Sequence, residues 1–295
     1  GGHWGLVPKL HALAVAGKAT DPFGARTTMT ASCTMGNRAP TYTGTANFVG
    51  AVSTGHSFGT YGGGANRYFH VFDFNSQMTA ADPDGDPVTI AFSASASGAS
   101  PQVRVEGPAS APTGIGIFGT AATVVNRDIA VRRTLSDGIA AGIVSTETFK
   151  LGNRAPTVTG FAGATSPGHT YVAGPPVAYR NAFTFTAAPA IAGADGDPLT
   201  VTWTAPTPAG STITVTPAGT ATAPTGITVS SSGPTGVGVN LAIGLQVTDN
   251  IAAAVTSTQN FNMGNRAPVL GNFNDVTLPG HTYTASNQTY SAVFS

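Results

Sequence analysis

Two short segments of the chain each hold several carboxylates within a few residues. Their aspartates are Asp82, Asp84, Asp86, Asp195 and Asp197. Closely spaced carboxylate oxygens are the ligands that a hard cation such as calcium needs. In the second segment Gly193 takes the place of the first aspartate, so that copy offers one ligand fewer. Two interpretations stay open for both segments: a calcium site, or a polar Asp-Gly turn that leads into a strand.

Three histidines recur in one local setting, each after a glycine and before a serine or threonine, at His56, His169 and His281. One imidazole per copy cannot chelate a metal by itself. Such a histidine suits hydrogen bonding at the end of a domain, or a contact between neighbouring domains that loosens on protonation. The second interpretation predicts that acidification to about pH 5 disrupts assembly.

The pentapeptide Gly-Asn-Arg-Ala-Pro, called the marker below, occurs at 36–40, 152–156 and 264–268. It supplies an asparagine and an arginine in each copy: Asn37, Arg38, Asn153, Arg154, Asn265 and Arg266. A guanidinium at a junction can bond carbonyls or carboxylates of both adjacent domains. We therefore expect these residues to clamp neighbouring domains, with plain exposure as the alternative.

The spacing of the markers predicts the domain organisation. They lie 116 and 112 residues apart, an interval too long for a solenoid unit and suited to a small independent domain. We expect the C-terminal part of a repeat at 1–35, complete repeats at 36–151 and 152–263, and the N-terminal part of another at 264–295. A partial domain exposes an apolar sheet face and unpaired strand edges. Either a longer polypeptide of such repeats or strand pairing between subunits would complete it.

Alternating apolar residues predict strands rather than helices. Between Val237 and Val247 every second residue is apolar, which is the period of a half-buried strand. The segments after the two Asp-Gly-Asp-Pro turns alternate in the same way and place Phe92 and Trp203 in equivalent core positions. With about seven strands per repeat, the pattern favours an all-β fold of tandem sandwiches.

Composition excludes some classes of function. Charged residues make up 9% of the chain and the formal net charge is zero, so no basic surface is available to bind nucleic acid. Few charges of either sign favour self-association. No apolar run of about 18 residues is present, so we expect no membrane span. The single cysteine, Cys33, takes the place of Phe149 and Phe261 in the repeat, which predicts a buried core residue; an intermolecular disulfide is the alternative.

Three elements together carry a resemblance that covers almost the whole chain: the Asn-x-Ala-Pro junction, the Asp-x-Asp-Gly-Asp-Pro turn and a late Val-x-Asp strand end. They resemble the tandem immunoglobulin-like and cadherin-like repeats of bacterial surface proteins and adhesins. The resemblance implies an extracellular or cell-surface location, and it implies Asp82 and Asp84 as calcium ligands near the linker. The junctions depart from the cadherin pattern because they lack its flanking acidic residues.

These observations favour a structural role over catalysis. The chain has no nucleophile elbow, no histidine pair with metal spacing and no phosphate-binding loop, so we expect no enzyme. We expect a filament, sheath or stalk whose partners are copies of itself or adjacent repeats. The alternative is an adhesin whose end loops bind a glycan or a surface receptor. Trp4 and Tyr61 are the aromatic candidates for such a site, whereas Trp203 is expected to be buried.

Overall fold

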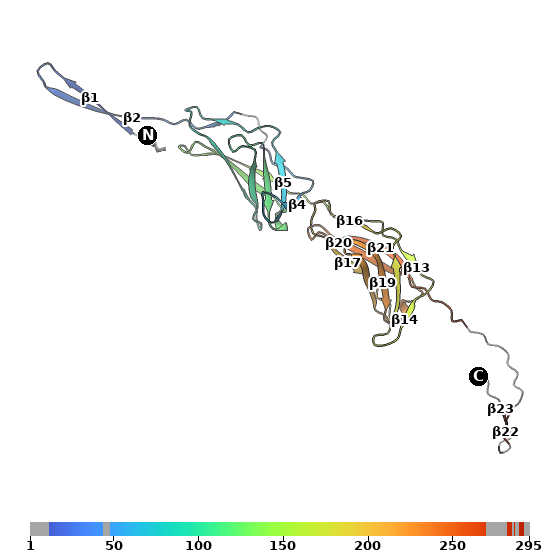
Figure 1. Ribbon diagram of the computed structural model, residues 1–295. Helices are drawn as coiled ribbons and strands as arrows, with labels where there is room; N and C mark the ends of the chain where they lie inside the picture. Colours follow the sequence, from blue (N-terminus) through green and yellow to red (C-terminus); the bar gives the residue numbers. More distant parts are fainter. Residues whose placement is uncertain (1–11, 44–47, 270–281, 285, 287–288, 292–295) are drawn as a thin grey trace.

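The computed structural model describes residues 12–43, 48–269, 282–284, 286 and 289–291. Strands dominate these residues, with two single-turn 3-10 helices at Ala122–Val124 and Pro234–Gly236. Within the described ranges no helix has the length and apolar character needed to cross a membrane. Figure 1 shows two sandwiches in series, with a separate hairpin before the first.

The second sandwich, which we call repeat 2, packs two four-stranded sheets. One has the order β14 (Thr170–Val172), β15 (Ala178–Thr184), β19 (Ala223–Ser231) and β18 (Ile213–Thr220). The other has the order β13 (Ala164–Thr165), β21 (Val255–Asn262), β20 (Leu241–Thr248) and β17 (Thr200–Thr204). A short ladder joins β12 (Thr157–Thr159) to β16 (Ala190–Ala192).

The first sandwich, repeat 1, follows the same plan. One sheet has the order β4 (Ser57–Thr60), β5 (Asn66–Asp73), β9 (Gly114–Gly119) and β8 (Gln102–Glu106). The other has the order β11 (Ile143–Phe149), β10 (Ile129–Ser136) and β7 (Thr89–Ser95). A parallel bridge between Val52 and Lys150 stands where repeat 2 pairs β13 with β21. The ladder of β3 (Thr41–Tyr42) and β6 (Ala80–Ala81) matches that of β12 and β16.

This strand order is that of an immunoglobulin-like sandwich. In repeat 2 the chain moves to the other sheet after β15, after β17 and after β19, while β18–β19 and β20–β21 are antiparallel hairpins within one sheet. Its sheets therefore match the orders A-B-E-D and C-F-G, with one short parallel strand added beside G. The prediction of tandem all-β sandwiches is confirmed.

The alternating pattern places the cores as expected. Ile243, Leu245 and Val247 are fully buried on β20, and the residues between them face away from this core. Phe261 on β21 lies within the same cluster, next to Phe161 and Phe183. Trp203 is half-buried rather than buried, because it packs at the margin of this cluster, with its ring 5.4 Å from that of Phe161.

One core position differs in chemistry between the repeats. Arg133 occupies an inward-facing place on β10 where repeat 2 has Leu245; Arg133 pairs with Phe92 and Leu245 pairs with Trp203. The guanidinium carbon lies 4.0 Å from the ring centroid of Tyr42 and 4.7 Å from that of Phe48. Stacking on two aromatic faces stabilises a guanidinium that is partly removed from water. Arg133 can therefore point inward at a position where repeat 2 has an apolar side chain.

The hairpin of β1 (Ala12–Thr20) and β2 (Arg26–Thr34) packs against no second sheet among the described residues. Its side chains are exposed from Ala14 onward, and Cys33 is exposed with them. The prediction of a buried Cys33 is therefore wrong. Alignment with Phe261 gives the position of Cys33 in its strand, but a strand residue is buried only where a second sheet covers it, as in repeat 2. A shorter ladder pairs β22 (Thr282–Thr284) with β23 (Thr289–Ser291).

Truncating Phe261 tests the core of repeat 2. Phe261→Ala should destabilise this repeat by about 3 to 5 kcal/mol, because it removes a fully enclosed ring and leaves a cavity. Urea unfolding followed by circular dichroism measures the loss. Phe23→Ala is the matched control, since its ring is 95% exposed, and its effect should stay within about 0.5 kcal/mol. Equal effects of the two changes would contradict the assigned core.

Candidate functional site at the junction between the repeats

The marker arginine binds the acidic loop of the repeat that it introduces. Arg154 donates its backbone N–H to Asp195 Oδ2 at 2.6 Å, its Nε–H to Asp195 Oδ1 at 2.5 Å and an NH2 hydrogen to the Ala194 carbonyl at 2.8 Å. Arg38 makes the same three bonds, to both oxygens of Asp84 at 2.6 and 2.7 Å and to the preceding carbonyl at 2.7 Å. The loop and the linker are thus held together by a charge-assisted clamp.

The marker asparagine reaches a second loop of the same repeat. Asn153 donates to Asp249 Oδ2 at 2.9 Å, and Asn37 donates to Asp137 Oδ2 at 2.8 Å. Burial raises the pKa of Asp249, but the hydrogen bonds from Asn153 and from backbone N–H groups outweigh burial and leave it below its usual value. The pKa of Asp137 is also lowered, chiefly by the bond from Asn37. Both aspartates therefore stay ionised and hold the marker in place.

Arg154 also packs on the end of repeat 1. A Cβ atom built on Gly55 would lie 2.5 Å from Arg154 Nε and 2.6 Å from Asp195 Oδ1, so only glycine leaves room for the clamp. Arg154 therefore contacts both repeats, while its hydrogen bonds go to repeat 2. Arg266 lies against Gly168 in the same way, with Nε 2.5 Å from the position of a Cβ. Its marker neighbour Asn265 is exposed.

His56 links the end of repeat 1 to the linker and to repeat 2. Its ring is buried, with Nδ1 2.9 Å from the Gly152 carbonyl oxygen and Nε2 3.0 Å from Asp197 Oδ1. Beside it, the Phe58 N–H donates to the Asp195 carbonyl at 2.8 Å. His169 repeats the first contact, with Nδ1 3.0 Å from the carbonyl oxygen of Gly264. His281 lies outside the described residues.

An apolar contact completes the junction. Ile251, in the loop after β20, packs against the hydrophobic core of repeat 1. The equivalent residue of repeat 1 is Ile139, whose side chain is 38% exposed. Burying Ile251 adds a hydrophobic contribution to the polar clamp, so the two repeats associate through both kinds of interaction.

The acidic segments are already bonded by the protein. Asp82, Asp84 and Asp86 do lie together, each with an oxygen within 4.8 Å of the others. However, both oxygens of Asp84 accept bonds from Arg38, and Asp82 Oδ1 accepts the N–H groups of Asp84 and Asp86. In repeat 2, Arg154 takes both oxygens of Asp195 and His56 bonds Asp197. The geometry favours the polar Asp-Gly turn over the calcium site in both copies.

Sequence reasoning missed three members of this site. Asp137 and Asp249 were not singled out as site residues, and Gly55 was noted only as the glycine before a histidine. A signal for the aspartates was present, because each repeat carries both an asparagine in its marker and an aspartate 100 or 96 residues later. The signal for Gly55 was the glycine that recurs before each of the three histidines, but the close approach itself depends on where the next repeat lies.

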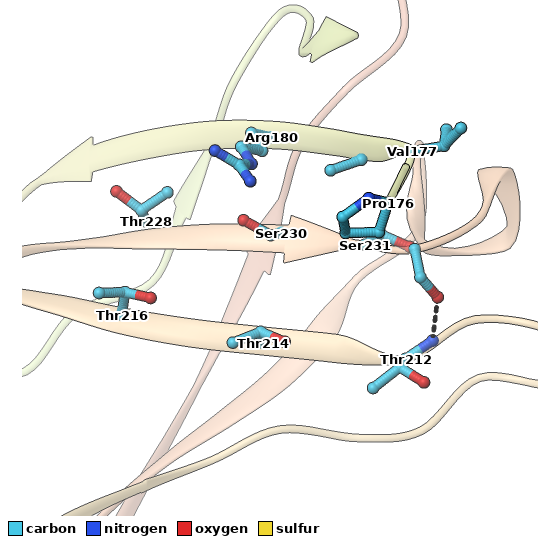
Figure 2. Close-up of a pocket in the computed structure, with 11 residues that line it drawn as sticks. Pro176, Val177, Arg180, Thr212, Thr214, Thr216, Thr228, Ser230 and Ser231 are labelled. Carbon is cyan, nitrogen blue, oxygen red and sulfur yellow. Dashed lines mark hydrogen bonds between the residues drawn. The ribbon is translucent and has the colours of Figure 1, made fainter. Parts of the chain in front are cut away.

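A separate groove lies on the outer face of β15, β18 and β19 in repeat 2 (Figure 2). It has a volume of about 470 Å³ and is open to solvent. Arg180 supplies its one charged side chain. Hydroxyl groups make up much of the lining, from Thr212, Thr214, Thr216, Thr228 and Ser230. Tyr61, the aromatic candidate in repeat 1, is half-buried and stacks on Phe69 at 4.6 Å, and Trp4 lies outside the described residues.

No protein-family model and no curated protein matches the chain. Among solved structures, it is similar to the human desmocollin-1 ectodomain at 10% identity and a TM-score of 0.28, over 85% of this chain and 42% of that one. It is also similar to the Ig1-2 module of the Drosophila receptor protein tyrosine phosphatase DLAR, at 8% identity and a TM-score of 0.22, over 76% of this chain and 98% of that one. The chain thus spans less than half of the desmocollin-1 structure. The fold assignment rests on strand order.

Gly55→Ala should open the junction, because the added methyl group collides with both partners of the clamp. We expect the Phe58 amide, which is bonded across the junction, to exchange its hydrogen about tenfold faster, the ratio given by about 1.4 kcal/mol. Gly59→Ala is the control, since nothing lies within 4 Å of its Cβ position. Unchanged exchange in Gly55→Ala would show that the repeats are not in contact there.

Chelation should leave the melting temperature unchanged. Arg38 bonds both oxygens of Asp84, Arg154 bonds both oxygens of Asp195, and His56 bonds Asp197, so calcium would have to displace these donors to bind either segment. Thermal melts in excess chelator and in millimolar calcium measure the difference, which should stay below about 1 °C. A clear fall in the chelator would restore the calcium interpretation.

Proposed function

We propose that this chain is an extracellular structural repeat protein that forms or decorates a filament, sheath or cell-surface stalk. The observation that carries the proposal is the junction, in which Arg154, His56 and Ile251 join repeat 2 to the end of repeat 1. A junction bonded in this way holds two sandwiches in one orientation. Such units in series make a stiff rod whose length grows with the number of repeats.

The linker adds to this stiffness. Seven residues separate the end of β11 at Phe149 from the start of β12 at Thr157, and Pro156 restricts the backbone directly before β12. Lys150 and Leu151 are themselves engaged in bridges to repeat 1. Little of the linker is left free to act as a hinge.

The surface suits packing between copies. Only 9% of the residues are charged and the net charge is zero, so neighbouring rods repel one another weakly. The partners that we propose are therefore further copies of the chain or adjacent repeats of the same type. A bacterial cell surface is the setting that the marker and turn motifs favour.

An adhesin is the second candidate, and the groove of repeat 2 favours it. A face of serine and threonine hydroxyls with one guanidinium offers hydrogen bonds to the hydroxyl and carboxylate groups of an acidic glycan. Binding of glycans to the chain, and its loss in Arg180→Ala, would favour this function over a purely structural one.

X-ray scattering of the chain tests the proposed rod. Arg154→Ala removes the two side-chain hydrogen bonds of the clamp, to Asp195 Oδ1 and to the Ala194 carbonyl, and leaves the buried charge of Asp195 without its guanidinium partner. We expect the distance between the two sandwiches to spread over a wider range as the junction bends. Arg180→Ala, an exposed arginine away from the junction, should keep the narrow distribution of the wild type. A wild-type distribution as broad as that of a flexible pair would refute the rod, as would electron micrographs of native material without elongated particles.

A further inference from the structure

The hydrogen bonds of His56 specify where its protons lie. The Gly152 carbonyl oxygen can only accept, so Nδ1 carries a hydrogen and donates it. Nε2 lies 3.0 Å from Asp197 Oδ1, which is a hydrogen-bond distance. One proton must therefore lie between Nε2 and Oδ1, bonded to the histidine or to the aspartate.

Without that proton the pair would repel. The lone pair of Nε2 would face an ionised carboxylate in a place where the side chains of His56 and Asp197 are 0% and 3% exposed. Water cannot screen the repulsion at such a site, and an unpaired buried acceptor is destabilising in itself. Moving the two repeats apart is the direct way to hydrate both groups.

We propose that the junction binds one proton as it closes, shared between His56 and Asp197, and that alkali opens the junction by removing it. The proposal rests on the proposed rod function, because it makes the stiffness of the rod depend on pH. Its sign is opposite to the loosening by acid that the sequence suggested. The reason is geometric: two acceptors face the imidazole, and both need a hydrogen.

The balance of charges at the junction supports the presence of this proton. With the proton, one arginine and one added positive charge face the two carboxylates of Asp195 and Asp197, so these four groups together carry no net charge. Without it the cluster keeps one uncompensated negative charge in a buried place. The titratable and charged groups that face His56 come from the linker and both repeats: Arg154, Asp195, Asp197, Asp249, Tyr68 and His70.

The neighbouring titratable groups keep their charge through the neutral and mildly alkaline range. Burial raises the pKa of Tyr68, and the charges of Asp197 and Asp249 raise it further, so the phenol stays neutral. Burial lowers the pKa of His70 against the opposing charge of Asp73, so this imidazole stays unprotonated there. Neither group can replace the proton of His56.

Acid affects the junction through a different group. The pKa of Asp249, which holds Asn153 of the linker, is lowered as described above. A lowered pKa gives stability that is present above the unfolded value and is lost as pH falls through the folded one, here below about pH 4.

Scattering of the full chain from pH 5 to 9 tests the proposal, with excess chelator in every buffer. We expect a narrow distance between the sandwiches at pH 5 and a broad one at pH 9. Asp197→Asn is the decisive variant, because its amide can donate a hydrogen to Nε2 of a neutral His56. It should keep the narrow distribution at pH 9. Asp86→Asn, at the equivalent position in repeat 1, should behave as the wild type.

Each outcome decides between the ideas. If the distance between the sandwiches were narrowly distributed at every pH, the shared-proton proposal would be wrong while the proposed rod would stand. If it were broadly distributed at every pH, the proposed rod itself would be refuted. If the junction of the Asp197→Asn variant opened at pH 9 as that of the wild type does, the shared-proton proposal would also be wrong. His56→Gln, which has no titrating group, should lose the dependence on pH between 5 and 9; if it kept that dependence, another group would be responsible.

Discussion

The junction depends on one buried carboxylate. The side chain of Asp195 is 1% exposed, and burying an unpaired charge destabilises a protein by several kcal/mol. Both of its oxygens accept hydrogens from Arg154, a residue of the preceding linker. These donors reach Asp195 only when the linker lies against the loop. The path of the linker is therefore set by the need to satisfy this charge.

The rest of the contact between the repeats builds on that arrangement. With the loop held, the Asp195 carbonyl is directed at the Phe58 N–H of repeat 1, and Asp197 reaches His56. The clamp lies so close to Gly55 that a side chain there has no space. The orientation of the two sandwiches thus follows from local requirements for hydrogen bonds and volume.

Local patterns in the sequence predicted the fold, while the site needed the structure. Alternation along β20 suffices for a strand with a buried face, because the pattern and the strand have the same period. The acidic segments were ambiguous because the same carboxylates suit a metal ion or a guanidinium, and Arg154 bonds a residue 41 positions away. The prediction that Cys33 is buried was wrong, because its position in a strand does not tell whether a second sheet covers that strand.

The two repeats keep the junction chemistry and differ elsewhere. Arg38 with Asp84 and Arg154 with Asp195 have the same bonds, yet the outer sheet faces are unlike. Repeat 1 carries a stack of Tyr61 on Phe69 there, whereas repeat 2 carries the hydroxyl-lined groove. Because the clamp involves only loops and linker at the ends of the sandwich, side chains on the outer faces are free to change without altering it. A scaffold built this way separates the spacing of its units from the surfaces that they present.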